Sequence, residues 1–176
     1  MQQNSRWHTL ETADQVAQAA CQQILIAAEQ AIADHGNFKL VLAGGGTPEK
    51  VYRLLAQADA DWAKWFIYYG DERCLPTDHA DRNSLMATQA FLEKVSIPSE
   101  QIFTIPAELG AEQAAKKYEQ VVADASPLIW FCWAWAKMVT RPVYFQAIKI
   151  RKMNWRMRYI THPNHRRNVF LSVPKL

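Results

Sequence analysis

The segment FKLVLAGGGTPEKVYRLLA constrains the fold most, because an apolar run leads through three glycines directly into helix signals. The run from Phe38 to Ala43 is short, apolar and typical of a buried strand. Thr47 fits the N-cap of the next helix and Pro48 fits its first position. The sequence therefore predicts a strand, a glycine loop and a helix in immediate succession.

Strands and helices alternate through residues 1–126. Thr12 and Gln15 fit a capping box for a long helix that ends at Gly36. Asn83 fits the N-cap of a later helix. The other expected elements are a strand over Trp65–Tyr69, a short strand within 97–106 and a helix over 110–125. This alternation predicts an α/β fold: a mainly parallel sheet flanked by helices in a Rossmann-like three-layer arrangement.

The glycine loop lies where such sheets bind ligands, outside the carboxyl end of a strand. Gly44, Gly45 and Gly46 let a ligand approach the backbone closely. The helix that follows offers free N–H groups and a positive dipole end, and Thr47 adds a hydroxyl. The loop suits a phosphate or a carboxylate; the alternative is a tight turn that binds nothing.

A charged tripeptide, Asp71-Glu72-Arg73, follows the next strand at the same edge of the sheet. The planar fork of Arg73 matches phosphate oxygens. Asp71 and Glu72 would orient Arg73 or act on the substrate. The alternative is a surface charge cluster. His79 lies in a polar loop, where we expect it to be exposed to solvent.

Three segments resemble the 6-phosphogluconolactonase family, which is related to the glucosamine-6-phosphate deaminases. They are LAGGGTPEKVYRLLA, YYGDERCLPTDHADRNSLMA and IPAELGAEQAAKKYE, and the resemblance covers about residues 10–126. It implies a NagB/RpiA-like fold. It also implies hydrolysis of 6-phospho-D-glucono-1,5-lactone to 6-phospho-D-gluconate in the oxidative pentose phosphate pathway, without metal or cofactor.

The same resemblance assigns roles to the two loops. It implies that Gly44, Gly45, Gly46, Thr47 and Arg73 hold the substrate and that Asp71 and Arg73 serve catalysis. The deaminases typically carry Asp-Glu-Tyr at the tripeptide, so the arginine favours the lactonases. A glucosamine-6-phosphate deaminase or isomerase-like enzyme and a non-catalytic sugar-phosphate binder stay open as alternatives.

The composition changes abruptly after Ser126. Residues 1–126 hold all 17 Asp and Glu, all 6 Gly and 10 of the 20 Lys and Arg, whereas residues 127–176 hold the other 10 Lys and Arg and no acid. The family carries a stretch like G-M-G-x-D-G-H-T-A-S-L-F-P in this region, with a histidine taken to activate water. The chain reads CWAWAKMVTRPVYF there instead.

Reading one nucleotide out of frame explains this tail. The joined bases of Trp133–Ala134, Trp135–Ala136 and Met138–Val139 encode glycine without any choice of codon. They fall at the G-x-G-x-x-G spacing of the missing stretch. One lost base near the codons for Pro127 and Leu128 would account for the tail and for a truncated chain.

We therefore expect one lactonase domain that is incomplete after residue 126, and a tail over 127–176 that is not a domain. The chain would be inactive, poorly folded beyond about Ser126 and without the remaining parallel strands of the sheet. The rival hypothesis is a basic, aromatic tail that binds nucleic acid. We expect a cytoplasmic protein that binds neither nucleic acid, membrane nor metal; its oligomeric state is open.

Overall fold

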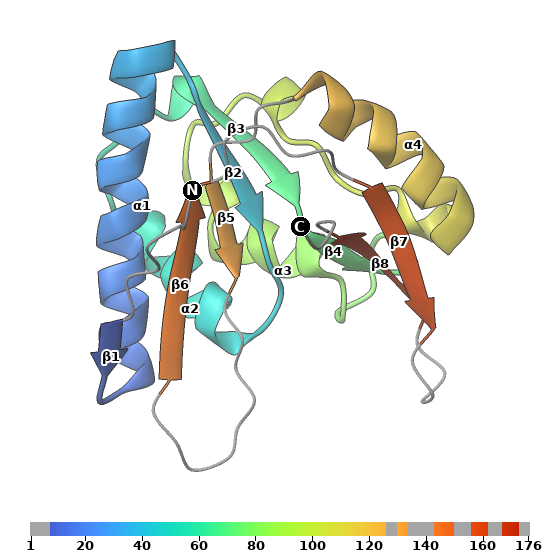
Figure 1. The fold of residues 1–176 in the computed structure, drawn as a ribbon, viewed down its shortest axis with the longest axis horizontal. Coiled ribbons are helices and arrows are strands. Elements are labelled where there is room, and N and C mark those ends of the chain that lie inside the picture. The colour runs from blue at the N-terminus through green and yellow to red at the C-terminus, as the bar shows by residue number, and fades with distance from the viewer. Residues whose placement is uncertain (1–7, 126–129, 134–142, 150–155, 162–166, 173–176) are drawn as a thin grey trace, which may run out of the picture.

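The computed structural model describes residues 8–125, 130–133, 143–149, 156–161 and 167–172 (Figure 1). Its helices are α1 (Ala13–His35), α2 (Gly46–Leu55), α3 (Asn83–Ala90) and α4 (Ala111–Asp124). Short 3-10 turns are η1 (Trp62–Lys64), η2 (Leu92–Lys94), η3 (Ser99–Gln101) and η4 (Ala107–Leu109). Its strands are β1 (His8–Leu10), β2 (Phe38–Leu42), β3 (Trp65–Tyr69), β4 (Asp71–Arg73), β5 (Trp130–Trp133), β6 (Val143–Lys149), β7 (Arg156–Thr161) and β8 (Arg167–Ser172).

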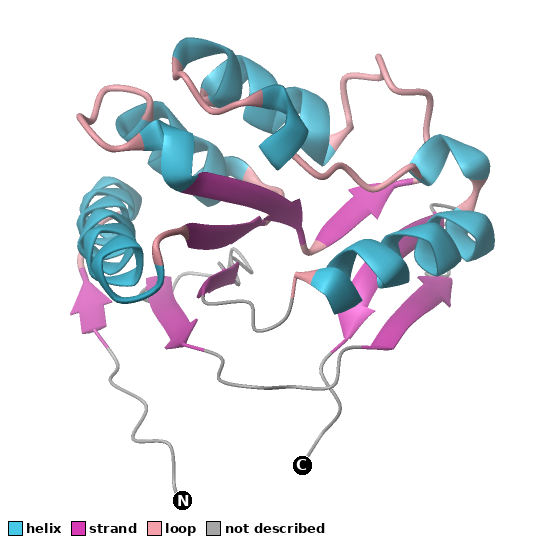
Figure 2. Ribbon diagram, turned by 90° about the horizontal axis from the view of Figure 1, so that it is seen from above, coloured by secondary structure: helices cyan, strands magenta, loops and turns pink. Residues whose placement is uncertain are grey.

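The main sheet has the strand order β1-β6-β5-β2-β3, and a second sheet has the order β4-β8-β7. β2 pairs in parallel with both β3 and β5, and β6 is antiparallel to both of its neighbours. Four of the five described strands of the main sheet therefore run in one direction, with helices flanking the strands (Figure 2). The predicted α/β fold with a mainly parallel sheet is confirmed.

The expectation that no parallel strand follows Ser126 is wrong at β5. This strand pairs in parallel with β2 through Leu40–Trp130 and Val41–Phe131. Strand pairing uses backbone N–H and C=O groups that every residue except proline carries. An apolar run can therefore add a strand even where its individual side chains differ from those of the family. The expectation about residues 127–176 as a domain stays a prediction.

Helix α1 follows its sequence signals closely. The Thr12 hydroxyl accepts a hydrogen bond from the Gln15 N–H at 3.2 Å, and the Gln15 side chain accepts one from the Thr12 N–H at 3.2 Å, which completes the capping box. Gly36 ends the helix in a left-handed conformation with φ of 77°. The predicted apolar face is buried: Val16, Ala20, Ile24, Ala27 and Ala31.

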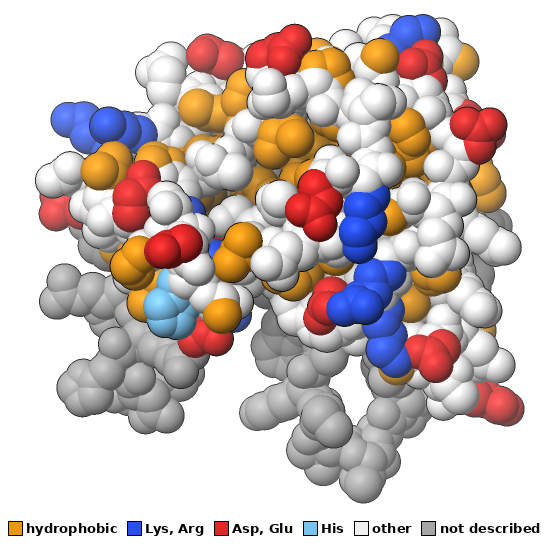
Figure 3. Space-filling view, turned by 180° about the vertical axis from the view of Figure 1, so that it is seen from behind, with side chains coloured by type: hydrophobic (Ala, Val, Ile, Leu, Met, Phe, Trp, Pro, Cys, Tyr) orange, Lys and Arg blue, Asp and Glu red, His pale blue; other side chains and the backbone are white. Residues whose placement is uncertain are grey.

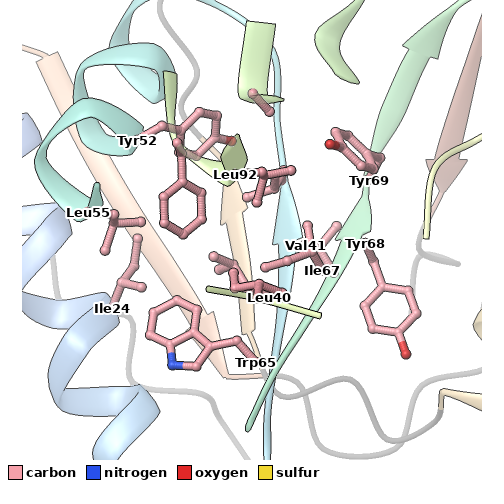
Figure 4. Close-up of a cluster of buried hydrophobic side chains, with 14 of the residues drawn as sticks. Ile24, Leu40, Val41, Tyr52, Leu55, Trp65, Ile67, Tyr68, Tyr69 and Leu92 are labelled. Carbon is pink, nitrogen blue, oxygen red and sulfur yellow. The ribbon is translucent and has the colours of Figure 1, made fainter. Parts of the chain in front are cut away.

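Part of the core lies between the main sheet and a layer in which α1 contacts α2 and α2 contacts α3, and buried residues of α4 belong to the same core cluster. Figure 4 shows Ile24 of α1, Tyr52 and Leu55 of α2, and Trp65 of β3 converging on Leu40 at the centre of β2. These five side chains are fully buried. Their packing fixes α2 against the sheet, and the N-terminus of α2 lies where β2 ends.

The predicted strand within 97–106 is reduced to a single parallel bridge between Ile67 and Ile102. The Phe103 N–H donates to the Ile67 carbonyl at 2.8 Å, but the Phe103 carbonyl accepts from the Tyr118 hydroxyl of α4 at 2.9 Å. The Tyr118 hydroxyl thus occupies the Phe103 carbonyl, which would otherwise be available to accept a hydrogen bond in a longer strand. The predicted strand is therefore correct in its position but too long.

The surface of the described residues carries no large charged field on the face in Figure 3, where acidic and basic side chains are interspersed. Its large exposed apolar side chains are Ile26 and Leu109. Within the described parts of the chain, none of the helices combines the length and the apolar character that a membrane crossing requires.

Candidate active site at the ends of β2 and β3

The two predicted loops leave the sheet at the same point. Leu42 and Tyr69, the last residues of β2 and β3, lie opposite each other in the parallel register. The Gly70 N–H donates to the Leu42 carbonyl at 2.9 Å, directly before the loops diverge. The carboxyl ends of these neighbouring strands therefore bring Gly44 and Asp71 side by side, as the sequence predicts.

Asp71 joins the two loops. Its carboxylate accepts hydrogen bonds from the backbone of Gly44 and from the side chain of Asn83, and it lies in the field of Arg73. Burial nevertheless raises the pKa of Asp71 above its ordinary value of 3.8, because desolvation outweighs the opposing effects of Arg73 and the hydrogen bonds. A partly buried carboxyl with a raised pKa, held at a strand end, is suited to accept or deliver a proton.

The three glycines differ in what the backbone requires of them. A Cβ on Gly44 would lie 2.0 Å from Oδ1 of Asn83, so only glycine fits there. Gly45 has φ of 111°, which disfavours any other residue. A Cβ on Gly46 would meet nothing within 4 Å, and its φ is ordinary. The fold therefore requires the first two glycines, and Gly46 is free to serve a ligand.

Helix α2 begins earlier than predicted. Its N-cap is Gly45 and its first residue is Gly46, whereas we expected Thr47 as the N-cap and Pro48 as the first residue. The positive φ of Gly45 turns the chain sharply enough for the helix to start at once. Pro48 is accommodated because the first-turn N–H groups of a helix have no intrahelical partner.

No side chain of the described residues caps the N-terminus of α2, whereas Thr12 caps α1 and Glu72 caps α3. Its first-turn N–H groups and the positive end of its dipole thus face the loop region beside Asp71. Such a helix end is suited to bind an anion. Thr47, half-buried at this turn, places its hydroxyl on the same helix start.

Tyr52 fixes the end of β2. Its hydroxyl accepts from the Ala43 N–H at 2.8 Å and lies 2.8 Å from the Ala43 carbonyl, to which it donates. Both backbone groups of the residue before Gly44 are therefore satisfied by one buried side chain of α2. This contact sets where the glycine loop starts relative to the helix that follows it.

Glu72 has a structural role that the sequence left open. It is fully buried, and its Oε1 accepts from the N–H groups of Asn83 and Arg73, each at 2.8 Å. Its Oε2 accepts from the Ser84 N–H at 2.9 Å. Glu72 therefore caps α3 and does not reach outward as a substrate group. The prediction that the Asn83 side chain caps this helix is wrong, because Asn83 is its first residue and points to the Asp71 carbonyl, 3.2 Å away.

Arg82 is the residue that sequence reasoning missed. It is 3% exposed, and its Nε lies 3.2 Å from Oε2 of Glu72. Its guanidinium also donates to the carbonyls of Leu75 and Ile105, at 2.9 and 3.2 Å. A cation directly before a helix opposes the helix dipole, so a paired acid could have been expected from this position. The ion pair between Arg82 and Glu72 anchors the middle residue of the charged tripeptide in the protein interior.

Arg73 is half-buried, and its Nε is a buried donor without a hydrogen-bond partner among the described residues. Its backbone N–H is held by Glu72, which fixes where the side chain begins. A guanidinium nitrogen without a partner among the described residues, on a side chain that lies in the field of Asp71, suits an anionic ligand. His79 is exposed, as predicted, and its Nδ1 accepts from the Asp81 N–H at 3.1 Å.

The described residues contain no group of three or more His, Cys, Asp or Glu side chains arranged to hold a metal ion. The segment in which the family carries its histidine stretch, residues 134–142, lies outside the described residues. Among the described residues, the candidate site thus comprises the glycine loop, the start of α2, Asp71 and Arg73.

A family model described as glucosamine-6-phosphate isomerases/6-phosphogluconolactonase matches residues 11–138. The chain belongs to this family. The match begins where the resemblance was expected to begin and continues past the predicted boundary at residue 126 into β5 and beyond. The shared segment includes both loops of the site.

Curated relatives with the lactonase name include one from Nostoc, 40% identical over 98 residues, which covers 55% of this chain and 41% of the relative. Another from Synechocystis is 40% identical over 95 residues, covering 53% of this chain and 40% of the relative. This chain therefore spans about two fifths of the length of these curated relatives.

Solved structures share the fold. The crystal structure of 6-phosphogluconolactonase from Thermotoga maritima has a TM-score of 0.63 and 27% identity, covering 68% of this chain and 54% of that one. A monomeric glucosamine-6-phosphate deaminase has a TM-score of 0.60 at 22% identity, covering 68% and 51%. The second likeness concerns the fold alone, which both branches of the family have in common.

Proposed function

We propose that the site binds the phosphorylated sugar lactone 6-phospho-D-glucono-1,5-lactone or its product 6-phospho-D-gluconate, and that the gene derives from a 6-phosphogluconolactonase. The observation that carries this proposal is the meeting of an uncapped helix start, the unpartnered Nε of Arg73 and the carboxyl of Asp71 at one edge of the sheet. The lactonase names of the relatives, at 40% identity, support the substrate class.

The glycine loop and the charged tripeptide would both contact the substrate. The anionic end of the substrate would lie against the first turn of α2 and the guanidinium of Arg73, where charge-assisted hydrogen bonds are strongest. Gly46 and Thr47 would line the approach to the backbone. Asp71, with its raised pKa, would face the reacting end as a proton acceptor or donor. In lactone hydrolysis, water attacks the carbonyl carbon and the bond from this carbon to the ring oxygen breaks, which leaves a carboxylic acid and a hydroxyl group. No redox cofactor is needed.

We further propose that this chain binds its ligand but does not hydrolyse the lactone. In the sequence that follows β5, residues 134–145 contain no histidine, so the water-activating base that the resemblance implies is missing. Binding and orienting the lactone without a general base should give a much lower rate, because a general base typically adds a factor of about 10² to 10⁴ in rate. Cytoplasmic location and the absence of a nucleic-acid partner stay predictions.

The test compares this chain with a version in which one base is inserted at the codons for Pro127 and Leu128. Lactone hydrolysis is followed by the appearance of 6-phosphogluconate, above the spontaneous rate. We expect turnover only from the frame-restored version. Turnover of glucosamine 6-phosphate by the restored version, without lactonase activity, would assign the chain to the deaminase branch instead.

Binding by the unaltered chain is tested separately, by calorimetric titration with 6-phosphogluconate. Arg73→Met removes a charged hydrogen-bond donor, which we expect to cost about 2 kcal/mol, roughly thirtyfold in Kd. Gly46→Ala should also weaken binding, because the fold leaves this position open. Arg53→Met, an exposed arginine on the last turn of α2, is the matched control. Equal loss from Arg53→Met and Arg73→Met would contradict the proposed site.

A further inference from the structure

A second cavity lies away from the candidate active site. It has a volume of about 330 Å³ and lies between α1 and the segment that leads into β3. Its lining includes Leu25, Ala28 and Ile32 of α1 and Trp65, the first residue of β3. β3 delivers Asp71 and Arg73 at its other end, so the two sites share no residue. The volume falls at the lower end of the range for small-molecule sites.

Trp65, which lines the cavity, carries a polar atom that no described residue satisfies. The side chain is fully buried, and its indole Nε1 has no hydrogen-bond partner among the described residues. Figure 4 shows the indole between the sheet and α1, with its nitrogen turned away from Leu40 at the sheet centre. Buried indole N–H groups usually have an acceptor, because leaving the donor unsatisfied costs about 1 to 3 kcal/mol. A hydrogen-bond acceptor on a ligand would remove this cost.

Three carboxylates surround the cavity: Glu29 on α1, and Asp59 and Asp61 on the segment before η1. All three are exposed. Asp61 lies 3.1 Å from Lys64, whereas the ion pairs of the described residues include neither Glu29 nor Asp59. Among the described residues, the cavity is therefore lined by exposed carboxylates, by apolar side chains of α1 and by Trp65, whose indole N–H lacks an acceptor.

We propose that this cavity binds a small organic cation, with an apolar body, a protonated amine at one end and a hydrogen-bond acceptor at the other. The body packs against Leu25, Ala28 and Ile32. The amine lies between Glu29 and Asp59, and the acceptor takes the Trp65 Nε1–H. The residues that supply the three features line one cavity, so a ligand that has all three fits better than one that lacks any of them. The proposal does not depend on the sugar-phosphate site.

Tyramine is the probe, because its phenolic oxygen, ring and ammonium group supply the three features. Binding to the full chain is followed by NMR through the indole N–H resonance of Trp65, assigned with Trp65→Phe. We expect a saturable shift of this resonance. 4-Ethylphenol, which lacks the ammonium group, should bind about fivefold more weakly or worse, as loss of one partly exposed ionic contact predicts. The comparison of the two ligands is made on the unaltered chain, and Trp65→Phe serves only to assign the resonance.

Substitutions test the carboxylates of the cavity. The double variant Glu29→Gln with Asp59→Asn should weaken tyramine binding about fivefold or more and leave 4-ethylphenol unaffected. Glu119→Gln, an exposed position on α4, is the matched control and should change neither. The proposal is overturned if tyramine leaves the Trp65 resonance unmoved up to about 10 mM. It is also overturned if tyramine and 4-ethylphenol bind equally well.

Discussion

Replacing Gly44 by alanine should destabilise the protein by about 2 to 4 kcal/mol. The new Cβ would lie 2.0 Å from Oδ1, 2.6 Å from Cγ and 2.8 Å from Nδ2 of Asn83. All three distances are shorter than any ordinary carbon contact, so Asn83 must leave its position. Asn83 is itself buried at the first turn of α3.

The magnitude has two parts. Overpacking of a well-packed region costs about 1 to 3 kcal/mol. Displacement of Asn83 also breaks the hydrogen bond from its Nδ2 to the Asp71 carbonyl at 3.2 Å, which is worth about 1 kcal/mol. Removing the obstacle should undo most of the first part, so Gly44→Ala with Asn83→Ala should be less destabilised than the sum of the two single variants.

The assay is urea denaturation followed by far-UV circular dichroism. Gly46→Ala is the matched control: its Cβ meets nothing within 4 Å, so we expect a change of less than about 0.5 kcal/mol or a slight gain. The reasoning fails if Gly44→Ala costs no more than Gly46→Ala. It also fails if Asn83→Ala gives no relief, since the clash would then lie elsewhere.

Three further predictions concern buried groups around the site. Burial raises the pKa of Asp71 in the folded protein, so the contribution of Asp71 to stability is fully present below its unfolded-state pKa and is lost as the pH rises through its folded-state pKa. Asp71→Asn should flatten this decline in urea melts measured across pH, and an unchanged pH profile would contradict the prediction. Glu72→Gln leaves the buried cation of Arg82 with Glu108, 3.5 Å away, as its remaining ion-pair partner among the described residues, and should cost about 3 kcal/mol. Glu72→Gln with Arg82→Met should cost less than the sum of the two; full additivity in urea denaturation would count against a coupled pair. Tyr118→Phe leaves the Tyr69 N–H, 2.8 Å from the lost hydroxyl, without its acceptor and should lower stability by about 1 to 3 kcal/mol; thermal melts that match the parent protein would refute this.

Local signals predicted both ends of α1 and the strands β2 and β3, but not the starts of α2 and α3. Thr12, Gln15 and Gly36 placed both ends of α1, because capping and the left-handed turn depend on residues within a few positions of each other. The start of α2 was missed by two residues, since Gly45 and Thr47 both suit an N-cap and only the backbone conformation distinguishes them.

The proximity of the two loops was predicted from the sequence, whereas the roles of their residues stay predictions. Strand ends and glycines placed Gly44 beside Asp71, because parallel strands that are neighbours in a sheet end at the same edge. The sequence could not separate Asp71 from Glu72, which are adjacent carboxylates of the same type. Burial separates them: Glu72 points into the protein and caps α3, and Asp71 lies beside Gly44 and Arg73.

By itself, the sequence determined the α/β class, the glycine loop and the charged tripeptide, and the change of composition after Ser126. These follow from periodicity, capping and residue type, which act over short distances along the chain. Only the tertiary structure decided that Arg82 neutralises Glu72, that Asn83 makes Gly44 indispensable while Gly46 stays free, and that Trp65 keeps an unsatisfied donor beside a cavity. Each of these depends on contacts between residues distant in sequence, and such contacts are set by how helices and strands pack.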